Sequence, residues 1–224
     1  MLKKFALIVA GGSGSRMKSD APKQFLEVAG KPILMHTIEA FFCFDRTIEF
    51  ILVLPENEQA RWKELCTDFN FTVSHRIAAG GRTRFESVKN GLDLIGEDGI
   101  VFIHDGVRPL VSQQTLQNCL VATLEKGNAL PVVPVSESVR YVDENGNRAL
   151  DRSKYFLVQT PQTFRAADIK KAYKQTYSEL FTDDASVLES MGLKIYTVAG
   201  NRENIKITFP EDLQITEFLI KYRF

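Results

Sequence analysis

Cysteine and histidine are scarce in this chain of 224 residues, which has three of each. Cys43, Cys66 and Cys119 are odd in number and widely scattered, a pattern that fits neither a disulfide framework nor the paired spacing of a zinc site. We therefore interpret them as reduced core thiols. Long apolar runs are absent too, because none approaches the ~20 residues that span a bilayer, and the run at 5–10 is too short for a signal-peptide core. We expect a cytoplasmic protein without a membrane span.

An excess of charge of either sign is also absent, since Lys plus Arg and Asp plus Glu both number 28. A neutral chain has no overall field to attract nucleic acid or a membrane surface, so any anion site must come from local clustering. The chain also lacks what covalent catalysis would need. It has no G-x-S-x-G motif, His36 falls in a helix pattern, His75 lies on an expected strand, and His104 closes a buried strand, where packing is a commoner role than catalysis.

The most informative segment that is present, IVAGGSGSRMKSDAPKQF at 8–25, joins an apolar strand to a glycine-rich turn. The glycines tolerate positive φ, so successive backbone N–H groups can form a concave anion nest. Arg16 and Lys23 follow the turn and add full positive charges. The segment therefore indicates a nucleoside triphosphate site. The alternative is a plain strand-to-helix turn with solvated basic residues.

Two other phosphate-binding loops fit this segment poorly. A dinucleotide-binding loop reads G-x-G-x-x-G, but Met17 stands where the third glycine belongs, and the spacing of a P-loop is missing. No acidic residue closes the second expected strand, where Leu54 and Pro55 stand, although Glu56 is near. An NAD-linked oxidoreductase is therefore disfavoured, but it is not eliminated.

Short β-rich runs alternate with helical patterns along the chain, which predicts an α/β fold with a Rossmann-like, mostly parallel sheet and helices on both faces. Helices are expected to begin near Pro32, Ser112, Ala166, Asp184 and Pro210, the fourth ending at Met191. Strands are expected at 5–9, 50–54, 72–77, 100–104, 130–135, 195–198 and 205–208.

One stretch departs from this alternation and predicts an antiparallel β-arm at about 137–158. Its β-branched and aromatic residues flank Asn145-Gly146, the preferred pair of a type I′ hairpin turn. The arm is rich in charge and has few large apolar side chains, so it would be marginal alone and should lie against a second subunit. We expect one domain, residues 1–224, that dimerises through this arm.

Ligands of open α/β sheets bind beyond the carboxyl ends of the strands, and polar residues follow four of the expected strands. After the glycine turn come AGGRTR at 79–84 with Ser87 beyond it, HDGVRP at 104–109, and a late strand with Lys206. One carboxylate, Asp105, and five cations should therefore share a crevice. The cations are Arg16, Lys23, Arg82, Arg108 and Lys206. Such a set suits phosphoryl-type transfer, because a phosphate nucleophile, with its second pKa of ~6, needs no general base.

The motifs AGGSGSRM with PKQF, GGRTRFESV, HDGVRP, QTPQTF, DDASVLE and NIKIT-PEDL occur in this order along the chain. Together they resemble the 2-C-methyl-D-erythritol 4-phosphate cytidylyltransferase family of the non-mevalonate isoprenoid pathway, from about Leu7 to Leu219. The resemblance implies a nucleotide-diphospho-sugar transferase-like fold and a homodimer. It also implies Mg²⁺-dependent transfer of CMP from CTP to the polyol phosphate, with release of pyrophosphate.

The resemblance further implies roles for individual residues. Arg16 and Lys23 would stabilise the pentavalent transition state at the α-phosphate of CTP, and Asp105 would lie near the ribose, the metal and the acceptor. Residues lining the nucleotide would be Ala10, Gly11, Gly12, Ser13, Gly14, Gly81 and Ser87. Residues binding the acceptor would be Asp105, Arg108, Thr160 and Lys206 of one subunit with Ser138 and Arg152 from the partner's arm.

Two alternatives to this interpretation stay open. Ribitol-5-phosphate cytidylyltransferases share several of the motifs, so D-ribitol 5-phosphate is the alternative acceptor, although the LDRS and DDASVLE segments favour the methylerythritol enzyme. A non-catalytic nucleotide-binding regulatory protein of the same fold would be expected to lose Arg16 or Lys23, and both are present. Gly11 and Ser138 stand where the family more often has alanine and threonine, changes that leave the chemistry intact.

Overall fold

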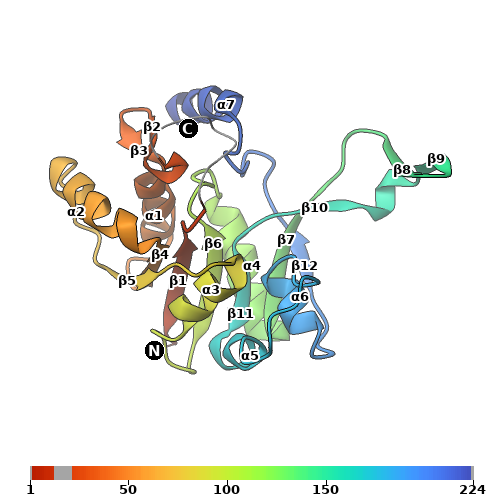
Figure 1. Ribbon diagram of the computed structural model, residues 1–224, viewed down its shortest axis with the longest axis horizontal. Coiled ribbons are helices and arrows are strands. Elements are labelled where there is room, and N and C mark those ends of the chain that lie inside the picture. Colours follow the sequence, from red (N-terminus) through yellow and green to blue (C-terminus); the bar gives the residue numbers. More distant parts are fainter. Residues whose placement is uncertain (1, 13–21, 223–224) are drawn as a thin grey trace.

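The computed structural model describes residues 2–12 and 22–222, and within them a central sheet of eight strands has helices on both faces (Figure 1). The strand order is β10-β7-β11-β6-β1-β4-β5, and β12 pairs with β7 off this path. The strands are β1 (Lys4–Val9), β4 (Glu49–Leu54), β5 (His75–Ala79), β6 (Ile100–Asp105), β7 (Asn128–Pro134), β10 (Phe156–Val158), β11 (Gln162–Arg165) and β12 (Thr197–Ala199).

The middle of the sheet is parallel and buried on both faces. β1 lies between β4 and β6, and its near-continuous apolar sequence KFALIV is typical of a strand covered on both sides. Ala6 and Ile8 face one core cluster, whereas Phe5 and Leu7 face the other. The first cluster involves α1 (Ile33–Phe44), α2 (Gln59–Asp68) and α4 (Gln113–Lys126), and the second involves α3 (Arg84–Leu92), α5 (Ala166–Ala172) and α6 (Asp184–Glu189).

The predicted mostly parallel sheet is confirmed, with an antiparallel insertion that the pattern did not indicate. β11 runs antiparallel between β6 and β7, and β10 runs antiparallel to β7. Several expected bounds shift by one to three residues, and the strand expected at 72–77 is β5, which begins at His75. The strand expected at 205–208 is wrong: this segment forms no strand, and Ile207 N instead donates a single backbone hydrogen bond to Val107 O.

The structure confirms the helix starts that were predicted from a serine cap and from a proline. Ser112 caps α4 by accepting from Thr115 N, and Gly127, at φ 96°, ends the same helix in the left-handed region. α7 (Pro210–Tyr222) begins at Pro210 as expected, and it packs over the short hairpin of β2 (Glu27–Val28) and β3 (Lys31–Pro32). No helix within the described residues has the length and apolar character needed to cross a membrane.

The arm is a separate two-stranded antiparallel sheet, β8 (Val139–Asp143) and β9 (Gly146–Leu150), that projects from the main body (Figure 1). The prediction of a type I′ turn centred on Asn145-Gly146 is wrong. The register pairs Asp143 with Gly146, so the central turn residues are Glu144 and Asn145, and neither has positive φ. The Asp143 carboxylate accepts from Asn145 N at 2.8 Å, an Asx turn that competes with the expected one.

Gly91, inside α3, lies where the helix packs against β1 and β4. A Cβ atom there would come within 2.8 Å of Leu7 Cδ1 and 2.9 Å of Val53 Cγ2. We expect Gly91→Ala to lower the free energy of unfolding by about 1 kcal/mol, because overpacking costs about 1–3 kcal/mol and the better helix propensity of alanine offsets only about 1. Urea denaturation measures this change. In the control Gly96→Ala the added Cβ meets nothing closer than 4.0 Å, and equal stability losses in both variants would contradict the packing argument.

Candidate active site

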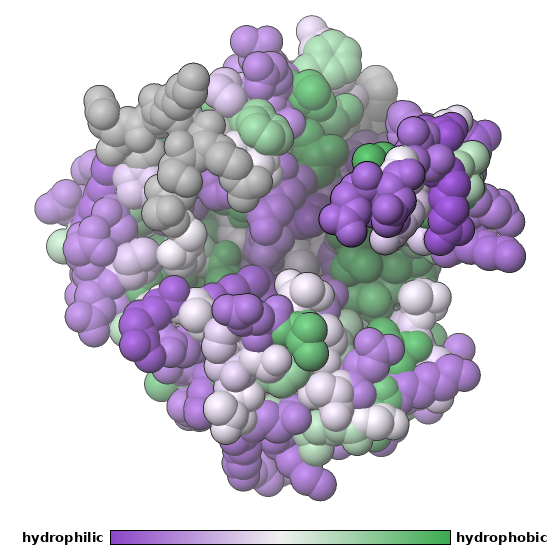
Figure 2. Space-filling view, turned by 45° about the vertical axis from the view of Figure 1, so that its right-hand side comes forward, coloured by the Kyte–Doolittle hydropathy of each residue, from purple (hydrophilic) through white to green (hydrophobic). Residues whose placement is uncertain are grey.

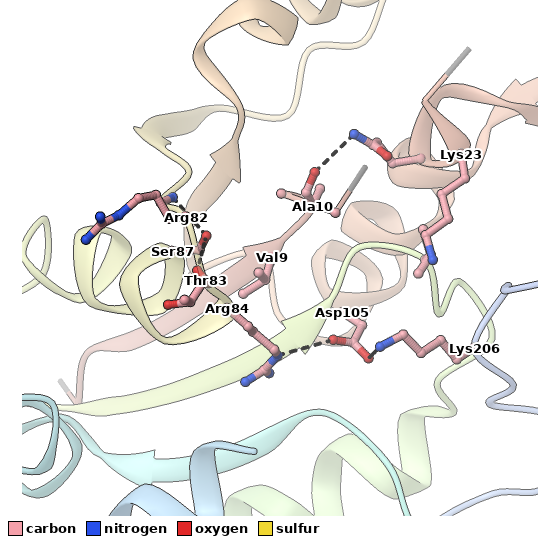
Figure 3. A pocket seen from close by; sticks show the side chains of 14 residues that line it. Val9, Ala10, Lys23, Arg82, Thr83, Arg84, Ser87, Asp105 and Lys206 are labelled. Atoms are coloured by element: carbon pink, nitrogen blue, oxygen red, sulfur yellow. Dashed lines mark hydrogen bonds and ion pairs between the residues drawn. The ribbon is translucent and has the colours of Figure 1, made fainter. Parts of the chain in front are cut away.

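Two cavities open at the carboxyl ends of the parallel strands. The first, of about 370 Å³, lies beyond β1 and β6. Figure 2 shows the molecular face hollowed near its centre among hydrophilic side chains, and Figure 3 shows that the residues lining the first cavity come from separate elements, with Arg84 and Lys206 directed toward Asp105. Its lining consists of Val9, Ala10, Gly11, Gly12, Lys23, Gln24, Gly81, Arg82, Thr83, Arg84, Ser87, Asp105, Val107 and Lys206.

Gly11 and Gly12, at the start of the glycine-rich segment, line one side of the first cavity. Ala10 O accepts a hydrogen bond of 3.0 Å from Gln24 Nε2, which ties the end of β1 to η2 (Lys23–Phe25). Lys23 Nζ donates to Ile207 O at 3.2 Å, so the side chain ties η2 to the C-terminal segment. Three of the predicted nucleotide-site residues, Ser13, Gly14 and Arg16, lie outside the described residues.

The segment before α3 forms the opposite wall. Gly81 N donates to Ser87 Oγ at 2.9 Å, and Ser87 Oγ donates to Thr83 O at 2.9 Å. A Cβ atom on Gly81 would come within 2.3 Å of Glu86 Cβ, so the tight turn requires glycine. Gly81 and Ser87, both predicted from the sequence, are thus joined by a direct hydrogen bond at the cavity edge.

Arg84, and not Arg82, is the arginine of this segment that points into the crevice. Arg82 borders the first cavity, but its side chain is 91 % exposed and pairs with Glu86 of the next helical turn at 3.0 Å. Figure 3 shows Arg82 directed away from Asp105 and Arg84 directed toward it. Arg82 thus borders the crevice as predicted, but its pair with Glu86 holds the side chain at the surface and away from Asp105.

Asp105, the last residue of β6, is the carboxylate on which the basic side chains converge. Asp105 Oδ2 lies 3.2 Å from Arg108 Nε and 3.1 Å from Lys206 Nζ. Asp105 Oδ1 lies 3.9 Å from Arg84 Nε. Burial alone would raise the pKa of the Asp105 carboxyl, but Arg84, Lys206 and Arg108 outweigh burial and hold that pKa well below its usual range. Asp105 is therefore ionised. Lys206 reaches it from an irregular segment and not from the late strand that was expected.

His104 is a buried packing residue whose two ring nitrogens are both engaged. Its Nε2 donates to the carbonyl of Arg108 at 3.0 Å, so its Nδ1 accepts from Thr160 Oγ1 at 3.0 Å. The Thr160 oxygen in turn accepts from Asp105 N at 3.1 Å. Burial lowers the pKa of His104 to about 4, and the neutral ring thus links three residues predicted to bind the acceptor.

The second cavity, of about 330 Å³, adjoins the first. It is lined by Arg84, Asp105, Arg108, Val158, Gln159, Thr160, Gln162, Thr182, Asp183 and Lys206. Arg84, Asp105 and Lys206 line both cavities. Two ligands bound side by side would therefore meet beside the Asp105 carboxylate, among positive charges.

The structure of one chain does not bring Ser138 and Arg152 into either cavity. Both lie on the arm, where Arg152 begins η4 (Arg152–Lys154) and donates a hydrogen bond to the carbonyl of Ser136. Sequence reasoning missed Arg84 as a site residue, together with its partner Asp184 in α6. The DDASVLE motif contained Asp184, but only the fold shows that it meets a residue 100 positions away.

Comparison with known proteins extends over the whole described fold. The model of the 2-C-methyl-D-erythritol 4-phosphate cytidylyltransferase family matches residues 5–222. Proteins of that name from Bacteroides fragilis and Phocaeicola vulgatus are 53% and 52% identical, over 96% and 98% of this chain and 98% and 100% of their own. A solved 4-diphosphocytidyl-2C-methyl-D-erythritol synthase from Anaerococcus prevotii aligns with a TM-score of 0.83 at 25% identity, covering 98% of this chain and 96% of its own. The Thermus thermophilus enzyme aligns with a TM-score of 0.79 at 29% identity, covering 98% of each chain.

Proposed function

Since this chain belongs to the 2-C-methyl-D-erythritol 4-phosphate cytidylyltransferase family, we propose that its first cavity binds CTP and its second binds the polyol phosphate. The chain transfers CMP from CTP to 2-C-methyl-D-erythritol 4-phosphate in isoprenoid precursor biosynthesis, giving 4-diphosphocytidyl-2-C-methyl-D-erythritol and pyrophosphate. The observation that supports the assignment of the cavities is their common boundary at Asp105.

CTP would bind along the glycine-rich turn, with backbone N–H groups facing its phosphates. Lys23 and Arg16 would neutralise the charge that develops at the α-phosphorus in the transition state. Gly81 and Ser87, on the opposite side of the cavity, would contribute to recognition of the base and ribose, a role supported by their position in its lining. The residues proposed to line the nucleotide are Ala10, Gly11, Gly12, Ser13, Gly14, Gly81, Ser87 and Asp105.

The acceptor would place its phosphate near Arg108 and Lys206, with its polyol chain toward Thr160. The Asp105 carboxylate holds both cations in place, at 3.2 and 3.1 Å. An oxygen of the acceptor phosphate would attack the α-phosphorus of CTP while the bond to the bridging oxygen of pyrophosphate breaks. No proton has to be removed from the attacking group, because a phosphate monoester is largely dianionic near neutral pH.

We propose Mg²⁺ as the cofactor, with Asp105 as the residue nearest to it. Within residues 2–12 and 22–222, no group of three or more His, Cys, Asp or Glu side chains is arranged to hold a metal ion. A single carboxylate fits an ion that is held mainly by substrate phosphates and keeps several waters. Oδ1 of Asp105 suits this role, because its contact with Arg84, at 3.9 Å, is longer than those of Oδ2. The bound ion would neutralise charge on the triphosphate.

We propose that the enzyme is a homodimer whose arm supplies Ser138 and Arg152 to the partner's second cavity. The exposed apolar side chains of β10 and the arm support this proposal, because Val142, Phe156 and Leu157 are all more than half exposed in one chain. The odd, scattered cysteines support a cytoplasmic location. We further propose that residues 1–224 act as one nucleotidyltransferase domain, with the arm at about 137–158.

The choice of acceptor is the sharpest test of this function. Phosphate recognition by Arg108 and Lys206 is common to both polyol phosphates, so discrimination must come from the polyol end. We expect kcat/KM for 2-C-methyl-D-erythritol 4-phosphate to exceed that for D-ribitol 5-phosphate by about ten- to a hundredfold, because an unmatched buried hydroxyl costs ~1–3 kcal/mol. Pyrophosphate release with CTP and each acceptor, under identical Mg²⁺, measures the ratio.

The same assay separates the alternatives. A preference for ribitol phosphate would overturn the choice of acceptor and leave cytidylyl transfer standing. A protein that binds CTP but releases no pyrophosphate with either acceptor would instead be a non-catalytic nucleotide-binding protein. Replacing CTP by UTP in parallel tests the expected strong preference for cytosine.

A further inference from the structure

Arg84, at the boundary of the two cavities, is bound in a bidentate ion pair. Its Nη1 and Nη2 donate to Oδ1 and Oδ2 of Asp184, each at 2.7 Å, in a bidentate pair. Asp184 is 0 % exposed, and Tyr173 Oη donates to its Oδ1 at 2.6 Å. Burial alone would lower the pKa of Arg84, but Asp184 and Asp105 outweigh burial and raise it, so the guanidinium stays charged.

Asp184 is itself fixed to the sheet. The Asp183 side chain caps α6 by accepting from Ser186 N at 2.8 Å, and it also accepts from Gln162 Nε2 at 2.8 Å. Gln162 Oε1 accepts from Ala185 N at 2.7 Å. Gln162 begins β11, the antiparallel neighbour of β6, and Asp105 ends β6. The N-terminus of α6 is therefore tied to the strand beside Asp105.

The remaining edge of the Arg84 guanidinium faces Asp105. Because both Nη atoms are bound to Asp184, the Nε atom is the one nearest to Asp105, at 3.9 Å from Oδ1 (Figure 3). The arrangement places a buried anion behind Arg84, so the pair adds little net charge. Its contribution is geometric, because it keeps the guanidinium in ion-pair contact with Asp105 Oδ1, whereas Arg108 and Lys206 contact Oδ2.

We propose that Arg84 is a positioning residue for cytidylyl transfer. Clamped by Asp184, to which Tyr173 also donates, it limits through its ion pair the orientations open to the Asp105 carboxylate, and through it those of Arg108 and Lys206, to the one in which the acceptor phosphate meets the α-phosphate of CTP. This inference rests on the proposed binding of the two substrates in the two cavities. A side chain that orients reacting groups acts on kcat far more than on substrate binding.

A pair of variants separates positioning from mere support of the fold. In Arg84→Gln the Asp184 carboxylate stays buried without its partner, so the melting temperature should fall. The double variant Arg84→Gln/Asp184→Asn also lacks that buried charge, at nearly constant side-chain volume. Its melting temperature should therefore recover most of the decrease seen in Arg84→Gln. We expect kcat of the double variant to remain ~10–100-fold below wild type while its Kd for CTP changes less than about threefold.

Two further variants test the geometry. Arg84→Lys keeps the charge but loses the bidentate fork, and we expect kcat to fall by about tenfold. Arg76, on β5, is an exposed arginine that pairs with Glu49 of β4 at 3.4 Å. The variant Arg76→Gln should leave kcat and the KM values unchanged. A loss of kcat in Arg76→Gln as large as in Arg84→Lys would count against a specific role of Arg84.

The outcomes distinguish the inference from the function on which it rests. Wild-type protein is assayed first with CTP, Mg²⁺ and 2-C-methyl-D-erythritol 4-phosphate, and absence of pyrophosphate release would refute the proposed function. If wild type turns over and the Arg84→Gln/Asp184→Asn variant recovers kcat to within about threefold together with its stability, the positioning role is overturned and the function stands.

Discussion

Lys23→Ala is expected to lower turnover by roughly two to four orders of magnitude, because a cation that stabilises charge in the transition state acts mainly on kcat. Lys23 lines the proposed nucleotide cavity, and its Nζ donates to Ile207 O on the segment that also carries Lys206. Removing the side chain takes away positive charge beside the proposed position of the triphosphate. Steady-state kinetics with saturating CTP measure the loss, and calorimetric titration should show a much smaller change in CTP affinity.

Lys31→Ala is the matched control for Lys23→Ala. Lys31 lies on the neighbouring short hairpin, pairs with Glu39 at 2.7 Å and lines neither cavity. We expect it to keep wild-type turnover. Thermal melting of both variants separates chemistry from folding. If Lys23→Ala melts at a lower temperature but retains full activity per folded molecule, the lysine supports the fold and has no catalytic role.

Mixing two inactive variants is expected to restore activity if the arm reaches across the dimer. In a heterodimer of Lys23→Ala and Arg152→Ala subunits, the body of the Arg152→Ala chain keeps Lys23 and receives an intact arm from the other chain. One site of the two is then complete. The specific activity of isolated heterodimers should therefore reach about half of the wild-type value.

The control for this experiment comes from the same arm. Arg148 lies over the Tyr141 ring at 5.1 Å and is exposed, so Arg148→Ala should be active as a homodimer. Heterodimers are isolated with two affinity tags before the assay. Inactive heterodimers of verified composition would reject the shared site, because a body that uses its own arm has no intact site in either subunit.

The sequence alone determined which edge of the sheet carries the candidate site. Asp105 ends β6 and Arg108 follows it, whereas Gly81 and Ser87 follow β5, and the carboxyl ends of such parallel strands share one edge of the sheet. Their meeting around one pair of cavities could therefore be predicted from hydrophobic pattern and strand order. The same holds for the start of α4 at its serine cap and of α7 at its proline, because these signals depend on a few neighbouring residues.

Only the tertiary structure decided which arginine of the GGRTR run enters the crevice. Arg82 and Arg84 are identical in type and two positions apart, and the choice depends on partners elsewhere: Glu86 holds Arg82 at the surface, while Asp184 draws Arg84 inward. Likewise, the place of β11 between β6 and β7 and the irregular path that brings Lys206 to Asp105 depend on contacts between distant segments. Local periodicity reports which face of an element is apolar. It carries no information on which charged side chain, far along the chain, will neutralise another once both are buried.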